Sequence, residues 1–312
     1  MWDMGPLQMK CFVGVTDGAW YRFLSHRPDL DEVNFWQPSG RPLFKALSRG
    51  DPFLFKLKYP DNAICGGGFF EHASILPCGI AWDTFGEENG ASSFNRMVES
   101  ITRLRHEPVT LGTHIGCIIL RDPFFLPQDQ WIDPPADFSP NIVRGKGYDL
   151  TRSPGKELWA EVRLRLQGLS HSGAVADGSA VYGDPVLVKQ RLYQGAFRVL
   201  VTDVYGRRCA VTGERALPTL EAAHLVPVSK GGQHRVDNGL LLRSDVHTLF
   251  DRGYLTVTPD LTFRVSGKLK DDFDNGETYR EYDHERIWVP SHIDERPSRE
   301  FLEWHNDMVF LG

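Results

Sequence analysis

The stretch from Cys209 to Leu255 decides how this chain is interpreted, and it reads CAVTGERALPTLEAAHLVPVSKGGQHRVDNGLLLRSDVHTLFDRGYL. An apolar run from 220 to 226 ends at a proline and predicts a short strand. A glycine-containing loop follows, and the Asn-Gly pair at 238–239 is a strong turn signal. A second apolar run at 240–242 leads to Ser244 and Asp245, which can cap a helix that ends before Gly253. The order is therefore strand, long loop, strand and helix.

Polar side chains stand at the junctions of these predicted elements. His224 ends the first strand, Asn238 ends the loop, and His247 lies in the first turn of the helix. Asp251 follows His247 by four residues and so shares its helical face. Two side chains at this spacing can hold one metal ion. The pattern predicts a single cavity that contains His224, Asn238 and His247.

These residue types suit phosphodiester hydrolysis, which is among the slowest uncatalysed reactions in biology. Histidine titrates near neutral pH, so a neutral His224 can take a proton from the attacking water. Asn238 can fix the ring of this base through a neighbouring backbone carbonyl or through its own hydrogen bonds. A divalent cation neutralises charge on the phosphate and on the leaving oxygen, and the neutral imidazole of His247 can bind it.

The segments Leu220–Pro227 and Val236–His247 resemble the HNH, or ββα-metal, endonucleases. The resemblance includes the proline after the first histidine and the double glycine in the loop, and it extends from the helix before Cys209 to a closing helix near Pro297–His305. It implies that His224 is the general base, that Asn238 orders the loop and that His247 binds a divalent metal, with Mg²⁺ or Mn²⁺ expected.

The sequence departs from the family pattern at Ala223, where many members carry Asp or His as a second metal ligand. The second ligand must then come from elsewhere. Asp251 is the first candidate because of its helical spacing from His247. Glu221 is the second, since in a strand of period two it points away from the side of His224, Ala222 and Leu220.

The net charge of −6 hides an uneven distribution. Residues 189–270 carry 13 Lys and Arg against 7 Asp and Glu, whereas the remainder of the chain is acidic. A polyanion responds to the local field of a patch, so the basic region favours a nucleic-acid partner. Five basic side chains flank the predicted site and could contact phosphates or simply be solvated surface charges: Arg207, Arg208, Lys230, Arg235 and Arg243.

The length predicts two domains, at 1–169 and 185–312, joined by a small and polar linker at 170–184. The fold class expected is α+β, with a strand-rich, β-barrel-type N-terminal domain and flanking helices. A helix is predicted from Ser93 to Arg105. The strand candidates are Cys11–Val15, Ala63–Phe70, Ile115–Leu120 and Pro52–Tyr59. The last of these alternates apolar and polar from Phe53 on, with Leu54 an exception, as a half-buried strand should.

The segments Gly50–Leu57 and Ile64–Phe70 resemble the PUA-like barrels, which include the SRA and EVE modules that read modified bases. This resemblance implies that an extruded base stacks between aromatic faces while polar groups read its edge. The candidates lie beside turn signals, and in the alternative interpretation their aromatic rings fill the core. They are Asn34, Phe35, Trp36, Trp82 and Asp83.

The function expected is that of a metal-dependent DNA endonuclease of restriction type that recognises modified DNA. The alternatives are a DNA-binding reader with an inactive HNH module, or a nonspecific nuclease. The sequence shows no leader and no apolar run of membrane-spanning length, so a cytoplasmic protein without a membrane partner is expected. The five cysteines are expected as buried free thiols. One HNH site cuts one strand, which makes a homodimer an option.

Overall fold

The computed structural model describes residues 10–27, 30–171, 194–273 and 276–312, with backbone alone at 167–171. The chain divides into two compact units, Met1–Leu187 and Val188–Gly312, which are described separately. All but the first two residues of the predicted linker, and the first part of the helix expected before Cys209, lie outside the described residues. The predicted domain boundaries therefore stay a prediction.

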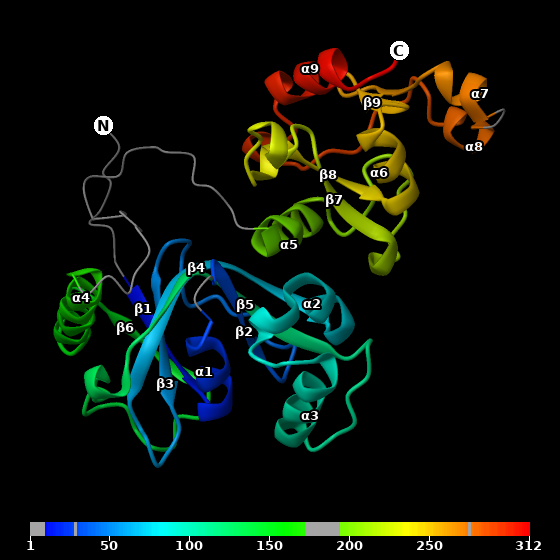
Figure 1. Cartoon of the computed structure of the whole chain (residues 1–312). Helices are drawn as coiled ribbons and strands as arrows, with labels where there is room; N and C mark the ends of the chain where they lie inside the picture. The colour runs from blue at the N-terminus through cyan, green and yellow to red at the C-terminus, as the bar shows by residue number, and fades with distance from the viewer. Residues whose placement is uncertain (1–9, 28–29, 172–193, 274–275) are drawn as a thin grey trace. The chain divides into compact units, whose positions relative to one another are not determined.

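The N-terminal unit is built on a mixed sheet with the strand order β2-β5-β4-β3-β1-β6 in its described part (Figure 1). Strands β1 and β3 run parallel, and the other neighbours are antiparallel. All four predicted strands are present. Those predicted at Ala63–Phe70 and Ile115–Leu120 extend further along the chain, and the one predicted at Pro52–Tyr59 ends two residues earlier. The bounds are β1 (Lys10–Thr16), β2 (Glu32–Gln37), β3 (Pro52–Leu57), β4 (Ile64–Pro77), β5 (His114–Phe125) and β6 (Gly145–Asp149).

Helices flank this sheet, as the α+β prediction requires. The helix predicted from Ser93 is confirmed, because the Ser93 side chain accepts a hydrogen bond from the backbone N–H of Arg96 and caps it. The α-helices are α1 (Gly18–Ser25), α2 (Cys78–Phe85), α3 (Phe94–Arg105) and α4 (Gly155–His171). Short 3-10 turns stand at η1 (Gly86–Asn89) and η2 (Gln128–Gln130).

The prediction that the β3 segment is a half-buried strand is wrong. Every residue of β3 is buried, because both faces of the sheet are covered. Phe53 and Phe55 point into a cluster with α1, whereas Leu54 points into a second cluster with α4. The one cation in this strand, Lys56, is buried as well, and its ammonium donates to Asn62 Oδ1 and to the Leu57 carbonyl. Burial lowers the pKa of Lys56.

The glycine run at 66–68 lets the backbones of β4 and β5 approach closely. A Cβ atom at Gly66 would lie 2.3 Å from the Phe124 carbonyl oxygen. The pairing of β4 with β5 shifts register between Gly67 and Phe69, which is the irregularity expected at glycines inside a strand.

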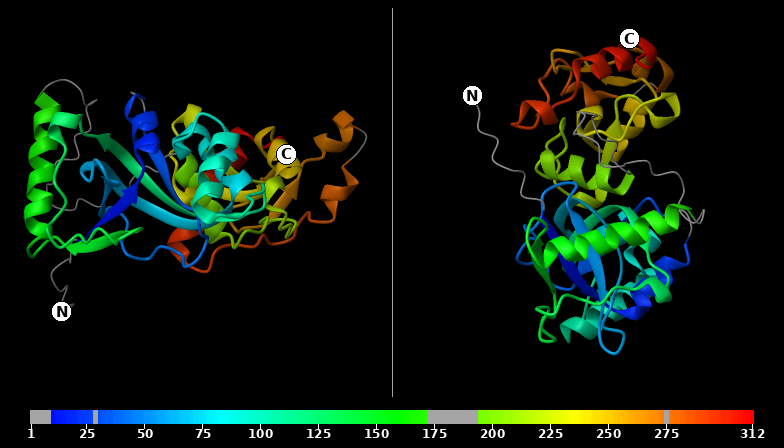
Figure 2. Two further views of the ribbon diagram at one scale, coloured as in Figure 1. Left: turned by 90° about the horizontal axis from the view of Figure 1, so that it is seen from below. Right: turned by 90° about the vertical axis from the view of Figure 1, so that its left-hand side faces the viewer.

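The C-terminal unit places a two-stranded hairpin between helices (Figure 2). The predicted order of strand, loop, strand and helix is confirmed by β7 (Leu220–His224), β8 (Gly239–Arg243) and α6 (Ser244–Asp251). The expected closing helix is α9 (Arg299–Met308). The other elements are α5 (Gln194–Val204), η3 (Leu217–Thr219), η4 (Val228–Lys230), η5 (Val236–Asn238), β9 (Leu255–Val257), β10 (Phe263–Val265), α7 (Lys268–Phe273), α8 (Glu277–Arg280) and η6 (Ile293–Glu295).

Two local features of this unit position the site. Strands β7 and β8 pair antiparallel with His224 opposite Gly239, so the two ends of the long loop meet at His224. Helix α6 begins at Ser244 without a side-chain cap, and the predicted cap by Ser244 or Asp245 is wrong. The Asp245 carboxylate is instead held by the Arg243 guanidinium at 2.6 and 2.9 Å.

The five cysteines are free and buried, as expected. Burial raises the pKa of the Cys11 thiol to about 12, so this thiol is neutral and unreactive at physiological pH. Within the described ranges, no helix is long and apolar enough to cross a bilayer.

Candidate active site

His224 lies at the end of β7 and is held by two aromatic neighbours. Its ring stacks on Phe197 of α5, with ring centroids 4.1 Å apart and an interplanar angle of 14°. On the other side, its Nε2 atom lies 3.0 Å from Nδ1 of His234 in the loop. The ring therefore has a fixed plane and a fixed hydrogen-bond partner.

His224 is neutral at physiological pH. Burial lowers the pKa of His224 to about 4, and the nearby His234 and His247 act in the same direction. Asp251 opposes this shift only in part. A neutral imidazole has a lone pair that can accept a proton, which is the state a general base must occupy before the reaction.

Asn238 is fully buried and closes the loop between β7 and β8. Its Oδ1 accepts from the Val226 N–H at 2.9 Å, and its Nδ2 donates to the carbonyls of Val226 and Gln233 at 3.0 and 2.9 Å. Its own carbonyl accepts from the Leu225 N–H. Asn238 thus ties the residues that follow His224 to the residue that precedes His234.

His247 on α6 is flanked by two carboxylates, one on each ring nitrogen. Its Nδ1 lies 2.6 Å from Glu221 Oε2 on β7, and its Nε2 lies 3.3 Å from Asp251 Oδ2 one helical turn away. The structure therefore brings both predicted ligand candidates to His247. Glu221 thus contacts a residue of α6, whereas His224 of the same strand stacks on Phe197 of α5.

The carboxylates dominate the electrostatics of His247. Burial alone lowers the pKa of His247, but the hydrogen bonds and negative charges of Asp251 and Glu221 outweigh burial, and the net shift is upward. The same negative field that holds a proton on this ring favours a divalent cation. Both carboxylates are about half exposed, so an ion can reach them.

The donor set at His247 fits a divalent metal in its chemistry. One imidazole nitrogen with carboxylate oxygens is a common ligand combination for such ions. In the part of the chain that the structure describes, no three His, Cys, Asp or Glu side chains are grouped as a completed ligand set. Here the two carboxylates contact opposite edges of one ring, which leaves one of them to bind the ion beside the ring and the other to orient the ring.

The five basic candidates are placed differently from one another. Arg207 pairs with Asp203, and Arg243 pairs with Asp245. Arg235 pairs with Asp237 and also lies over the Phe301 ring. Their charges are therefore partly neutralised within the unit. Arg208 stacks over the Trp288 ring at 4.6 Å, and the Lys230 side chain is exposed at the end of η4.

The predicted base-reading residues fall into a buried group and an accessible group. Asn34 and Phe35 are buried, and Phe35 packs against Trp20, Phe53 and Phe55, as in the alternative where aromatic rings fill the core. Three candidates keep accessible surface. Trp36 and Trp82 are half-buried, and Asp83 is exposed. The Trp36 indole donates to the Asn89 carbonyl, and the Trp82 ring contacts Phe94 edge-on.

Two side chains at His224 were missed by sequence reasoning. His234 lies in a loop with no periodic pattern, so nothing in the sequence directs its ring toward His224. Phe197 is one of several buried residues of α5, and its sequence position does not show which strand it packs on. Their contacts with His224 arise when α5 and the loop pack around β7, which is a tertiary effect.

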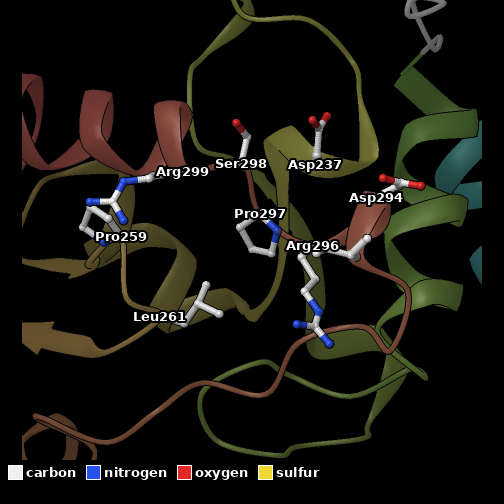
Figure 3. A pocket seen from close by; sticks show the side chains of 9 residues that line it. Asp237, Pro259, Leu261, Asp294, Arg296, Pro297, Ser298 and Arg299 are labelled. Atoms are coloured by element: carbon white, nitrogen blue, oxygen red, sulfur yellow. The ribbon is translucent and has the colours of Figure 1, made fainter.

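A cavity of about 430 Å³ opens beside the Asn238 turn but does not include the histidines (Figure 3). It lies where η5 meets the segment before α9, and the Ser298 N–H donates to the Asp237 carbonyl there. The two guanidinium groups that line it are bound to nearby residues. Arg296 donates to the Pro290 and Ser291 carbonyls, and Arg299 pairs with Glu303. This cavity is therefore not the single cavity predicted for His224, Asn238 and His247, because none of the three lines it.

Comparisons with known proteins agree with this geometry in the C-terminal unit. Residues 209–258 match the family model described as HNH endonuclease. No curated protein matches the chain in sequence. The chain is similar to the solved structure of ASCH from Zymomonas mobilis, with 14% identity over 49% of this chain and 94% of that chain, and a TM-score of 0.32.

A second solved structure is similar over most of the chain. It is the modification-dependent TagI restriction endonuclease, at 14% identity, with 95% of this chain and 81% of that chain covered and a TM-score of 0.29. The matched family segment contains His224, Asn238 and His247 together with Glu221 and Asp251. Residues 209–258 of this chain are therefore an HNH endonuclease domain.

Proposed function

We propose that this protein is a metal-dependent DNA endonuclease of restriction type, which recognises modified DNA through its N-terminal unit. One observation carries the nuclease part. Within the segment that matches the HNH family, His224 ends β7, Asn238 closes the loop, and His247 on α6 contacts the carboxylates of Glu221 and Asp251. A neutral base and an imidazole flanked by carboxylates that attract a cation are the two devices that hydrolysis of a phosphodiester uses.

His224 is the general base in this proposal. A water molecule between His224 and the scissile phosphate loses its proton to the imidazole, and the oxygen attacks phosphorus. The low pKa of His224 keeps the ring ready to accept that proton at neutral pH. Asn238 holds the loop so that the ring does not move, and it stays remote from the reacting atoms.

His247 and Asp251 would hold the divalent ion, with Mg²⁺ or Mn²⁺ as the expected species, and Glu221 would orient the His247 ring through Nδ1. Asp251 is favoured over Glu221 because it contacts Nε2 of His247 from one helical turn away and is the more exposed carboxylate, at 55% against 45%. When bound, the ion neutralises charge on the phosphate and on the leaving oxygen. Exposed Lys230 and the stacked Arg208 are the basic groups best placed to contact the backbone of DNA.

Recognition of a modified base is assigned to the N-terminal unit. The support for this assignment is the resemblance of residues 50–70 to PUA-like modules, together with accessible aromatic surface at Trp36 and Trp82. A flipped base would stack on these rings, and Asp83 would read its edge. Buried Asn34 and Phe35 would support this surface from beneath. One HNH site cuts one strand, so a double-strand break would need two copies of the chain or two sequential nicks.

The test is cleavage of matched duplexes that differ only in base modification, with Mg²⁺, Mn²⁺ or EDTA, using the full chain. The proposal predicts strand cleavage with either metal, none with EDTA, and faster cleavage of at least one modified duplex. Equal cleavage of all duplexes and of RNA would identify a nonspecific nuclease. Tight binding to modified DNA without cleavage would identify a reader with an inactive HNH module.

A further inference from the structure

We infer that His234 is a positioning residue for the general base, and that it selects the ring nitrogen of His224 that accepts the proton. This inference rests on the proposed function. His234 belongs to the loop between β7 and β8, and its Nδ1 lies 3.0 Å from His224 Nε2. The two rings are inclined by 61°, with centroids 4.9 Å apart, so the contact is a directed hydrogen bond and not a stack.

The His224 ring is restrained in two independent ways. The parallel stack on Phe197 fixes the plane of the ring, and the contact with His234 fixes its rotation within that plane. Phe197 also contacts the His234 ring, with centroids 5.6 Å apart. One phenylalanine from α5 therefore supports both imidazoles, and neither ring can turn without losing packing.

The loop that carries His234 is anchored by Asn238. The Asn238 amide donates to the Gln233 carbonyl, one residue before His234, and to the Val226 carbonyl, two residues after His224. A single buried side chain thus fixes the backbone on both sides of the imidazole pair. This anchor therefore helps to set the distance between the two rings.

The hydrogen bond has a chemical consequence for catalysis. In the assignment inferred here, the Nε2–H of His224 donates to Nδ1 of His234, and the lone pair of His224 therefore lies on its Nδ1. The proton of the attacking water then forms the Nδ1–H bond, and the electron pair of the broken O–H bond stays on the attacking oxygen. The imidazolium that results keeps its Nε2–H donated to neutral His234. In the opposite tautomer, His224 Nδ1 would already carry a proton and could not act as the base.

The experiment compares His234→Ala and His234→Asn with the wild-type chain and with His292→Ala, an exposed histidine that serves as the matched control. The readouts are the single-turnover cleavage rate at saturating DNA, the KM and the melting temperature. We expect His234→Ala to slow cleavage about 10–100-fold with an unchanged KM. Loss of a residue that hydrogen-bonds to a metal-binding histidine and orients it has an effect of this size. His234→Asn restores much of the rate, because its side-chain oxygen can accept from His224 Nε2.

Wild-type rate in His234→Ala would overturn the inference, and so would a His234→Asn variant as slow as His234→Ala. Nitrogen-15 NMR of the histidine rings gives a second readout that needs no activity. It should show His224 as the Nε2–H tautomer in the wild type and a mixture in His234→Ala, and a wild-type Nδ1–H tautomer would contradict the inference. Absence of metal-dependent cleavage by the wild type, with the expected tautomer present, would refute the proposed function alone.

Discussion

At the scale of single residues, the two carboxylates at His247 differ in the ring nitrogen they contact. Glu221 meets Nδ1 from β7, whereas Asp251 meets Nε2 from the same helix. A histidine binds a metal through one nitrogen and commonly donates the other N–H to a carboxylate. The two acids should therefore have separable roles, one as a ligand and one as a support for the ring.

Substitution of each acid by its amide separates these roles. We expect Asp251→Asn to lower the cleavage rate at every Mn²⁺ concentration, because the amide removes charge from the ion site. Glu221→Gln should raise the Mn²⁺ concentration needed for half-maximal cleavage about 10–100-fold and recover rate at saturating metal. Metal titrations of the cleavage rate measure both effects. The reverse order would make Glu221 the ligand.

At this scale, the sequence predicts on which strand, loop or helix each site residue lies. It does not predict which side chains contact these residues. The residues at the ends of the strand and the loop could be chosen because Pro227 and the Asn238-Gly239 pair mark those junctions locally, whereas the predicted cap at the start of α6 was wrong. The contact of Glu221 with His247 could not be predicted, since it depends on which face of β7 the helix α6 covers. The same holds for His234, whose place depends on a loop without periodicity.

At the scale of elements, α9 secures the helix that carries His247 and Asp251. His305 of α9 is almost completely buried, at 2% exposure, and stacks on Phe250 of α6 with ring centroids 3.8 Å apart. Its Nε2 lies 3.2 Å from the Phe250 carbonyl, and its Nδ1 lies 2.9 Å from the Thr256 hydroxyl. The end of α6 beside Asp251 is thus fixed by a helix about fifty residues away in sequence.

This contact predicts loss of stability in mild acid. Burial lowers the pKa of His305 to about 4, only partly opposed by the Phe250 carbonyl and Asp251, whereas the unfolded chain binds this proton near pH 6.5. The unfolded state therefore takes up the proton first. The contribution is complete above pH 6.5 and is lost as the pH falls toward 4, with a full size of about 3 kcal/mol.

Melting temperatures of the wild type and of His305→Gln between pH 7 and pH 4.5 measure this effect. The variant is expected to be less stable at pH 7 and to lose less stability on acidification, since an amide does not titrate. Parallel curves for the two proteins would show that His305 is not the group responsible. His224 has the same direction of shift, so some acid sensitivity remains in the variant.

At the scale of the whole chain, burial was harder to predict than element type. The β3 segment has the alternation of a half-buried strand, but α1 and α4 cover both faces of the sheet. The local sequence pattern does not reveal that α4 covers the second face of the sheet, because the residue types of Leu54 and Lys56 do not show which distant segment packs against them. The HNH segment could be predicted more completely, since its elements are short, contiguous and separated by strong turn signals.

Plasmid cleavage in Mn²⁺ by the wild type and by His224→Ala tests most directly whether His224 is the general base of an HNH nuclease. Loss of the base should slow cleavage about 10²–10⁴-fold, while DNA affinity and melting temperature stay close to those of the wild type. His292→Ala, prepared in parallel, should cleave at the wild-type rate. A folded His224→Ala protein that cuts DNA as fast as the wild type would contradict the account.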